Sequence, residues 1–94
     1  RAAGKLWLNE DDTRTYLAAK DAGFGRIDTA EKSLWVHQRN YGHIVPRRMA
    51  CWYMDLGGVG WLNGEDLWEN IGRLDAHYEA SLRESAVFCI LNFL

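Results

Sequence analysis

This sequence has almost no excess of charge of one sign, and it has no long apolar run. Its 11 Lys and Arg residues face 13 Asp and Glu residues, so the formal net charge over 94 residues is −2. Proteins that bind nucleic acids or anionic membrane surfaces instead carry clustered positive charge. The longest apolar stretch, residues 86–94, is about half the length that a membrane-spanning helix needs. We therefore expect neither a nucleic-acid partner nor a membrane partner.

Cysteines and recognisable metal-binding patterns are scarce as well. Cys51 and Cys89 are the only cysteines, and both lie inside apolar runs, which is typical of buried thiols in a reducing compartment. No signal peptide is visible, so we expect a cytoplasmic protein. His37 and His43 lie six residues apart, which misses the i, i+4 spacing that places two ligands on one face of a helix. We therefore expect no metal and no cofactor.

The residues that are present indicate a globular chain with short strands. Hydrophobic residues make up 48% and charged residues 26% of the sequence, which excludes a disordered chain. Apolar runs of strand length cover residues 5–9, 49–54 and 86–91, and each of them predicts a strand. The middle run is apolar at every position, as a parallel strand covered on both faces requires.

Two helices are predicted between these strands. Apolar residues recur at helical spacing over residues 29–45 and 64–82. A capping-box signature precedes the first helix, and Pro46 stops it. Trp35 and Trp68 lie on the apolar faces of the two helices, and we expect both of them in the core.

The resulting order is strand, helix, strand, helix, strand, which predicts an α/β fold with parallel strands. Three parallel strands and two helices cannot cover both faces of a sheet by themselves. The sequence also begins at Arg1 rather than at Met and ends in an apolar run. We therefore expect this chain to be a piece of a longer protein.

Carboxylates follow the first two predicted strands. Residues 10–12 (EDD) follow the first strand and Asp55 follows the second, with Arg14, Trp52 and Trp61 close by in sequence. The carboxyl ends of parallel strands meet at one edge of the sheet, which is where α/β active sites lie. Paired carboxylates with aromatic platforms are the chemistry of sugar hydrolysis.

Each of these features also has a purely structural interpretation. An acidic cluster after a strand is more often a solvated turn than a site, and Asp55 can simply initiate a turn. Arg14 can pair with Asp12 at the surface. Trp52 and Tyr53 point to opposite faces of their strand, so at most one of them faces a site on a given side.

Several segments occur in an order that resembles a known family. These segments are residues 10–16 (EDDTRTY), 29–33 (TAEKS), 38–40 (QRN), 50–56 (ACWYMDL) and 60–62 (GWL). Together they resemble the C-terminal part of the catalytic barrel in β-galactosidase-like glycoside hydrolases, family 42 and its relatives in the retaining clan A. The resemblance covers about residues 5–82 and implies the seventh strand to the eighth helix of a (β/α)₈ TIM barrel.

The resemblance also implies roles for individual residues. Glu10 takes the place of the nucleophile, and the acid/base Glu lies on the fourth strand of the barrel, outside this chain. Asp12 and Arg14 would orient the nucleophile or bind sugar hydroxyls. The residues expected to line the sugar subsite are Trp52, Asp55 and Trp61.

On this hypothesis residues 1–84 are the C-terminal fragment of a glycosidase barrel, and residues 85–94 begin the following domain or form a closing strand. The expected partners are a carbohydrate substrate, the rest of the barrel and the following domain, and the isolated fragment is expected to be inactive. Two alternatives remain open: a small, complete α/β interaction domain, and a non-catalytic sugar-binding module. A complete domain would bury Trp7, Trp52 and the strand at residues 86–91, whereas a barrel segment would leave large apolar faces bare.

Overall fold

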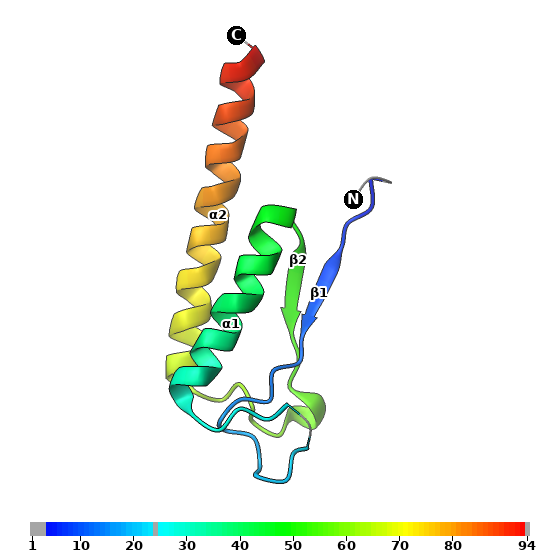
Figure 1. Cartoon of the computed structure of the whole chain (residues 1–94), viewed down its shortest axis with the longest axis vertical. Helices are drawn as coiled ribbons and strands as arrows, with labels where there is room; N and C mark the ends of the chain where they lie inside the picture. The colour runs from blue at the N-terminus through cyan, green and yellow to red at the C-terminus, as the bar shows by residue number, and fades with distance from the viewer. Residues whose placement is uncertain (1–3, 24, 94) are drawn as a thin grey trace.

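Two short parallel strands and two long helices make up the chain (Figure 1). The computed structural model describes the backbone of residues 4–23 and 25–93, and the side chains of residues 4–23 and 25–84. Its elements in chain order are β1 (Leu8–Asp11), α1 (Ala30–Ile44), the 3₁₀ turn η1 (Val45–Arg47), β2 (Ala50–Tyr53), the 3₁₀ turn η2 (Leu56–Gly58) and α2 (Glu65–Phe93). The chain is therefore mixed α/β, as expected.

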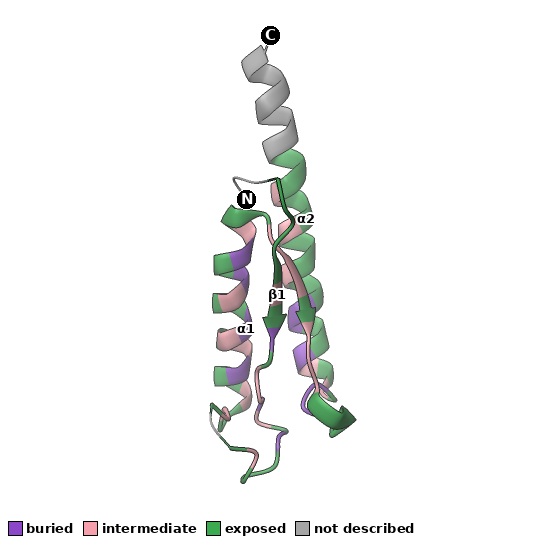
Figure 2. Cartoon of the chain, turned by 90° about the vertical axis from the view of Figure 1, so that its right-hand side faces the viewer, coloured by how far each residue is buried: buried purple, intermediate pink, exposed green. Residues whose placement is uncertain are grey.

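The two strands pair in parallel, and α1 makes the connection between them. In their register Glu10 lies opposite Trp52 and Asp11 lies opposite Tyr53. Both helices lie on the same side of this sheet, and the other side is open (Figures 1 and 2). The sheet therefore has one face packed against helices and one face without a covering layer among the described residues.

Helix α1 begins and ends where local chemistry requires. The hydroxyl of Thr29, the N-cap residue, accepts a hydrogen bond of 3.2 Å from the backbone N–H of Lys32, which satisfies one of the donors left free at a helix start. Pro46 lies in the 3₁₀ turn that follows the helix, since its ring cannot continue an α-helix. Arg48 then takes a left-handed conformation (φ 50°) and turns the chain toward β2.

The core lies between the two helices and the sheet. The buried face of α1 repeats at helical spacing but is partly polar: it consists of Ser33, His37, Tyr41 and Ile44. Helix α2 and the segment before it contribute apolar side chains, namely Trp61, Leu62, Leu67 and Ile71.

The third predicted strand, over residues 86–91, is wrong. These residues continue α2, which extends to Phe93 instead of ending at Leu82. The reason is the absence of any helix-breaking residue, because the last glycine before this segment is Gly72 and no proline follows Pro46. The expected domain boundary after residue 84 falls inside this helix and stays a prediction.

Two other expectations also need correction. Trp35 and Trp68, expected in the core, are 55% and 52% exposed. The Trp68 ring meets that of Tyr53 in β2 edge to face, with 6.4 Å between centroids, but about half of the side chain stays at the surface. Strand β1 begins three residues later than predicted, so Glu10 and Asp11 lie inside the strand rather than after it. Within the described residues, no helix is long and apolar enough to cross a membrane.

Candidate functional site at the carboxyl ends of the strands

Glu10 and Trp52 lie side by side on the open face of the sheet. They are register partners in neighbouring strands, and both are exposed, Trp52 to 41%. Because side chains alternate along a strand, Leu8, Glu10 and Trp52 point to the side away from the helices. Asp55 lies two residues after the carboxyl end of β2, so it lies at the same end of the sheet as Glu10. If Asp55 lay at the other end of the sheet, Asp55 and Glu10 could not belong to one site.

Asp55 holds the glycine-rich turn after β2. Its carboxylate accepts hydrogen bonds from the backbone N–H groups of Val59 (3.1 Å) and Gly60 (2.9 Å). Gly57 inside this turn has φ of 75°, a conformation that favours glycine. The hydrogen bonds of Asp55 are therefore those of a residue that forms a turn.

Asp12, Arg14 and Trp61 form a second group next to the strand ends. Arg14 Nη2 lies 3.9 Å from Asp12 Oδ2, and the Arg14 guanidinium carbon lies 5.4 Å from the centroid of the Trp61 ring. Trp61 is buried, and its carbonyl accepts a hydrogen bond from the hydroxyl of Thr15. Of the two tryptophans expected to line a sugar subsite, only Trp52 therefore presents an exposed ring.

The connection from β1 to α1 is long but tied down. Arg26 donates hydrogen bonds to the backbone carbonyls of Ala18 (2.9 Å) and Tyr16 (3.2 Å). The backbone N–H of Ile27 donates to the carbonyl of Arg14 at 2.8 Å. These bonds hold the two arms of the loop together, next to the carboxyl end of β1.

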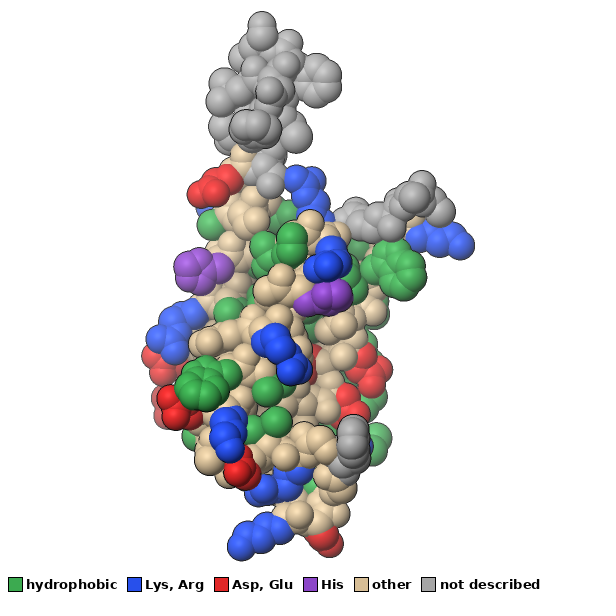
Figure 3. All heavy atoms as spheres, in the orientation of Figure 1, with side chains coloured by type: hydrophobic (Ala, Val, Ile, Leu, Met, Phe, Trp, Pro, Cys, Tyr) green, Lys and Arg blue, Asp and Glu red, His purple; other side chains and the backbone are tan. Residues whose placement is uncertain are grey.

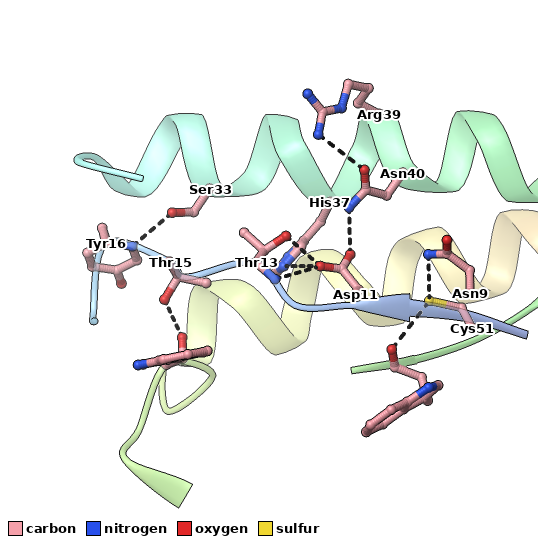
Figure 4. A network of polar contacts seen from close by, with 12 residues as sticks. Asn9, Asp11, Thr13, Thr15, Tyr16, Ser33, His37, Arg39, Asn40 and Cys51 are labelled. Carbon is pink, nitrogen blue, oxygen red and sulfur yellow. Dashed lines mark hydrogen bonds and ion pairs between the residues drawn. The ribbon is translucent and has the colours of Figure 1, made fainter. Parts of the chain in front are cut away.

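Asp11 is the site residue that the sequence analysis missed. It is 3% exposed and faces α1 (Figure 4). Its Oδ2 accepts a hydrogen bond from the side-chain amide of Asn40 at 2.8 Å, and its Oδ1 accepts from the backbone N–H of Thr13 at 3.1 Å and from the Thr13 hydroxyl. Strand alternation was the available signal, because in a strand Glu10 and Asp11 must face opposite sides.

His37 of α1 lies beside this carboxylate. Its side chain is fully buried, and Nε2 lies 3.9 Å from Asp11 Oδ1, too far for a hydrogen bond. Burial lowers the pKa of His37, and the negative charge of Asp11 opposes that shift. The ring meets that of Tyr53 edge to face, with 5.6 Å between centroids. Burial, followed by the neighbouring Tyr41, raises the pKa of Tyr53, so the layer behind the sheet favours neutral His37 and Tyr53 side chains.

No family model matches the chain. No curated protein or solved structure is significantly similar to it either. Function therefore has to be inferred from the site itself.

Mixed charges and a groove characterise the described surface away from the carboxyl ends of the strands. Among the described residues, no group of three or more His, Cys, Asp or Glu side chains is placed to hold a metal ion. On the face seen in Figure 3, acidic and basic side chains are mixed rather than gathered by sign. A groove lined by Trp7, His43, Arg47 and Met49 opens at the amino ends of the strands, away from Glu10.

Proposed function

We propose that this chain is the last third of a (β/α)₈ barrel in a retaining, β-galactosidase-like glycoside hydrolase, with Glu10 as its nucleophile. The observation that carries the proposal is the pairing of Glu10 with Trp52 on the open face, at the carboxyl end of parallel strands. In such barrels the helices cover the outside, and the active site lies at the carboxyl ends of the strands. Glu10 and Trp52 would then face the mouth of the barrel.

The exposed apolar surface supports a barrel segment rather than a self-contained domain. Leu8 on the open face is 60% exposed and Trp7 is 58% exposed, although both lie at the sheet, where a small domain would bury them. The sheet has two strands, so the outer edge of each strand is unpaired within the described part of the chain. Further parallel strands on both sides would pair these edges and cover the open face.

The proposed reaction uses Glu10 in two steps. A carboxylate oxygen of Glu10 attacks the anomeric carbon, and the bond to the leaving-group oxygen breaks as a general acid protonates that oxygen. Water then hydrolyses the glycosyl ester and restores the carboxylate. The Trp52 ring offers an apolar face for the sugar. The general acid belongs to a strand outside this chain, so the chain alone should be inactive.

The supporting residues differ in how they would contribute. Arg14, which lies between Asp12 and the Trp61 ring, would hold the loop beside the substrate, and Asp12 would bind sugar hydroxyls. Asp55 would act mainly by shaping the turn below the sugar, since its carboxylate already accepts two backbone hydrogen bonds.

The test is hydrolysis of aryl β-glycosides by the full-length protein. Glu10→Gln should lower kcat by several orders of magnitude, and added azide should restore turnover of a Glu10→Gly variant by replacing the missing nucleophile. Glu31→Gln is the matched control, because Glu31 is an exposed residue in the first turn of α1. Unchanged turnover in Glu10→Gln would remove Glu10 from catalysis.

A non-catalytic sugar-binding module is the second candidate, favoured by the exposed ring of Trp52. In that case a sugar would bind equally well to wild type and to Glu10→Gln, while Trp52→Ala would abolish binding. Sugar binding without any hydrolysis by the wild-type protein would support this candidate.

A further inference from the structure

The three acidic residues at the end of β1 face different surroundings, and the middle one has the most contacts. Asp11 is buried, and both of its carboxylate oxygens accept hydrogen bonds from protein donors. One donor is the side chain of Asn40, on α1, and the other donors belong to Thr13, just after the strand (Figure 4). The carboxylate therefore ties the end of β1 to the helix behind the sheet.

Asn40 is oriented for this contact. Arg39 Nη2 lies 3.4 Å from Asn40 Oδ1 and donates to it, so the amide nitrogen of Asn40 faces Asp11. The backbone carbonyl of Asp11 also accepts a hydrogen bond of 2.9 Å from Met54 N–H. Residue 11 thus joins β1 to α1 through its side chain and to the chain after β2 through its backbone.

The register of β1 depends on this junction. A slip by one residue would turn every side chain of the strand to the other face of the sheet. It would bring Asp11 to the open face and move Glu10 against α1, away from Trp52. The apolar pattern does little to prevent this, because β1 has only four residues and exposes Leu8. The buried carboxylate and its donors on α1 and Thr13 therefore restrain the register of the strand from the helix side.

We propose that Asp11 is a positioning residue, which holds Glu10 and Trp52 together on the open face through its hydrogen bond to Asn40. The placement of the two side chains follows from the geometry alone, whereas its catalytic consequence rests on the proposed function. If Glu10 is the nucleophile, then loss of Asp11 lowers kcat although Asp11 itself faces away from the substrate.

The test measures the placement directly. Register partners in neighbouring strands lie about 4.8 Å apart, within the range of roughly 4.4–6.8 Å that a disulfide spans. In a full-length protein with Cys51 and Cys89 replaced by alanine, Glu10→Cys and Trp52→Cys should therefore cross-link rapidly on mild oxidation. Cysteines at positions 9 and 52 should not, because Asn9 points to the helix side.

Asp11→Ala, which removes the acceptor of all three hydrogen bonds from Thr13 and Asn40, should slow the 10–52 cross-link at least about tenfold, the size expected from losing a single hydrogen bond to a charged group. Asn40→Ala should slow it to a similar extent, and Asp11→Asn should slow it less, since an amide can still accept from Asn40. The matched control is Asp21→Ala at an exposed loop residue. Rates are compared below the melting temperature of each variant, where loss of stability alone leaves the cross-link unchanged.

The outcomes separate this inference from the proposed function. Equal cross-linking rates in wild type and in Asn40→Ala would overturn the inference, even if Asp11→Ala fails to fold. If the rates fall as expected while wild type hydrolyses no glycoside, Asp11 is still a positioning residue and the proposed function fails. If wild type hydrolyses glycosides through Glu10 and the rates do not change, the function stands and the inference fails.

Discussion

Glu10, Asp11 and Asp12 are neighbours of similar chemistry with three different surroundings. Glu10 is exposed beside Trp52, Asp11 is buried against α1, and Asp12 lies at the surface 3.9 Å from Arg14. Strand geometry separates Glu10 from Asp11, because consecutive side chains of a strand point to opposite faces. An acidic cluster therefore becomes one candidate nucleophile, one buried restraint and one surface carboxylate.

His37 should make the stability of the fold depend on pH. Burial lowers its pKa below the ordinary value of about 6.5, so the unfolded chain binds the proton more readily than the folded chain does. The contribution of His37 to the free energy of unfolding is therefore fully present above a pH of about 6.5. It falls as the pH drops below that value and levels off once the pH is below the folded-state pKa. The groups facing His37 are Asp11 from β1 and Tyr53 from β2.

Urea unfolding between pH 5 and pH 7.5, followed by far-UV circular dichroism, measures this effect. His37→Phe should flatten the pH dependence, because phenylalanine does not titrate. The variant should keep the fold, because neither ring nitrogen of His37 has a hydrogen-bond partner to lose. His43→Gln, at an exposed position on the same helix, should keep the wild-type slope. An equal slope in His37→Phe would assign the pH dependence to other groups.

At the scale of elements, local chemistry was predictable from the sequence and tertiary placement was not. The start and stop of α1 depend on a cap and a proline, both visible in sequence. The buried face of α1 was not visible, because Ser33 and His37 lie in it while Trp35 does not. Hydrophobicity cannot identify a face that a polar network such as Asp11–Asn40 occupies.

The strands show the same division. Both parallel strands could be predicted, because apolar runs of strand length alternate with helical patterns. The third strand failed, since an apolar run after a helix is ambiguous unless a glycine or proline separates them. The carboxyl-end position of the candidate site followed from the topology, but the burial of Trp61 depends on how Arg14 and the β1–α1 loop pack.

Thr29 should contribute measurably to the stability of α1. Thr29→Ala removes the acceptor for the Lys32 N–H and should lower the free energy of unfolding by about 1 kcal/mol. Thr29→Ser keeps the hydroxyl and should restore most of this loss. Denaturant titration of the three proteins gives the comparison. If Thr29→Ser is as unstable as Thr29→Ala, the loss comes from the methyl group and the capping role is contradicted.

At the scale of the whole molecule, the open face of the sheet decides between a barrel segment and a complete small domain. Leu8 is 60% exposed on that face. In a barrel it would point into a closely packed interior, whereas in a complete domain of this structure it would stay in water. Leu8 would therefore stabilise a barrel through its burial, whereas it would contribute little to the stability of a complete domain of this structure.

Leu8→Gln in the full-length protein separates them. A barrel interior predicts a loss of about 2–4 kcal/mol, because the substitution removes apolar contacts and buries an amide without a partner. A solvent-exposed position predicts a change within about 0.5 kcal/mol. Leu82→Gln is the matched control, since Leu82 lies on α2 and is 39% exposed. Denaturant unfolding of the three proteins measures the difference. A loss for Leu8→Gln no greater than that for Leu82→Gln would contradict the barrel, because no layer of side chains would then cover the face that carries Glu10.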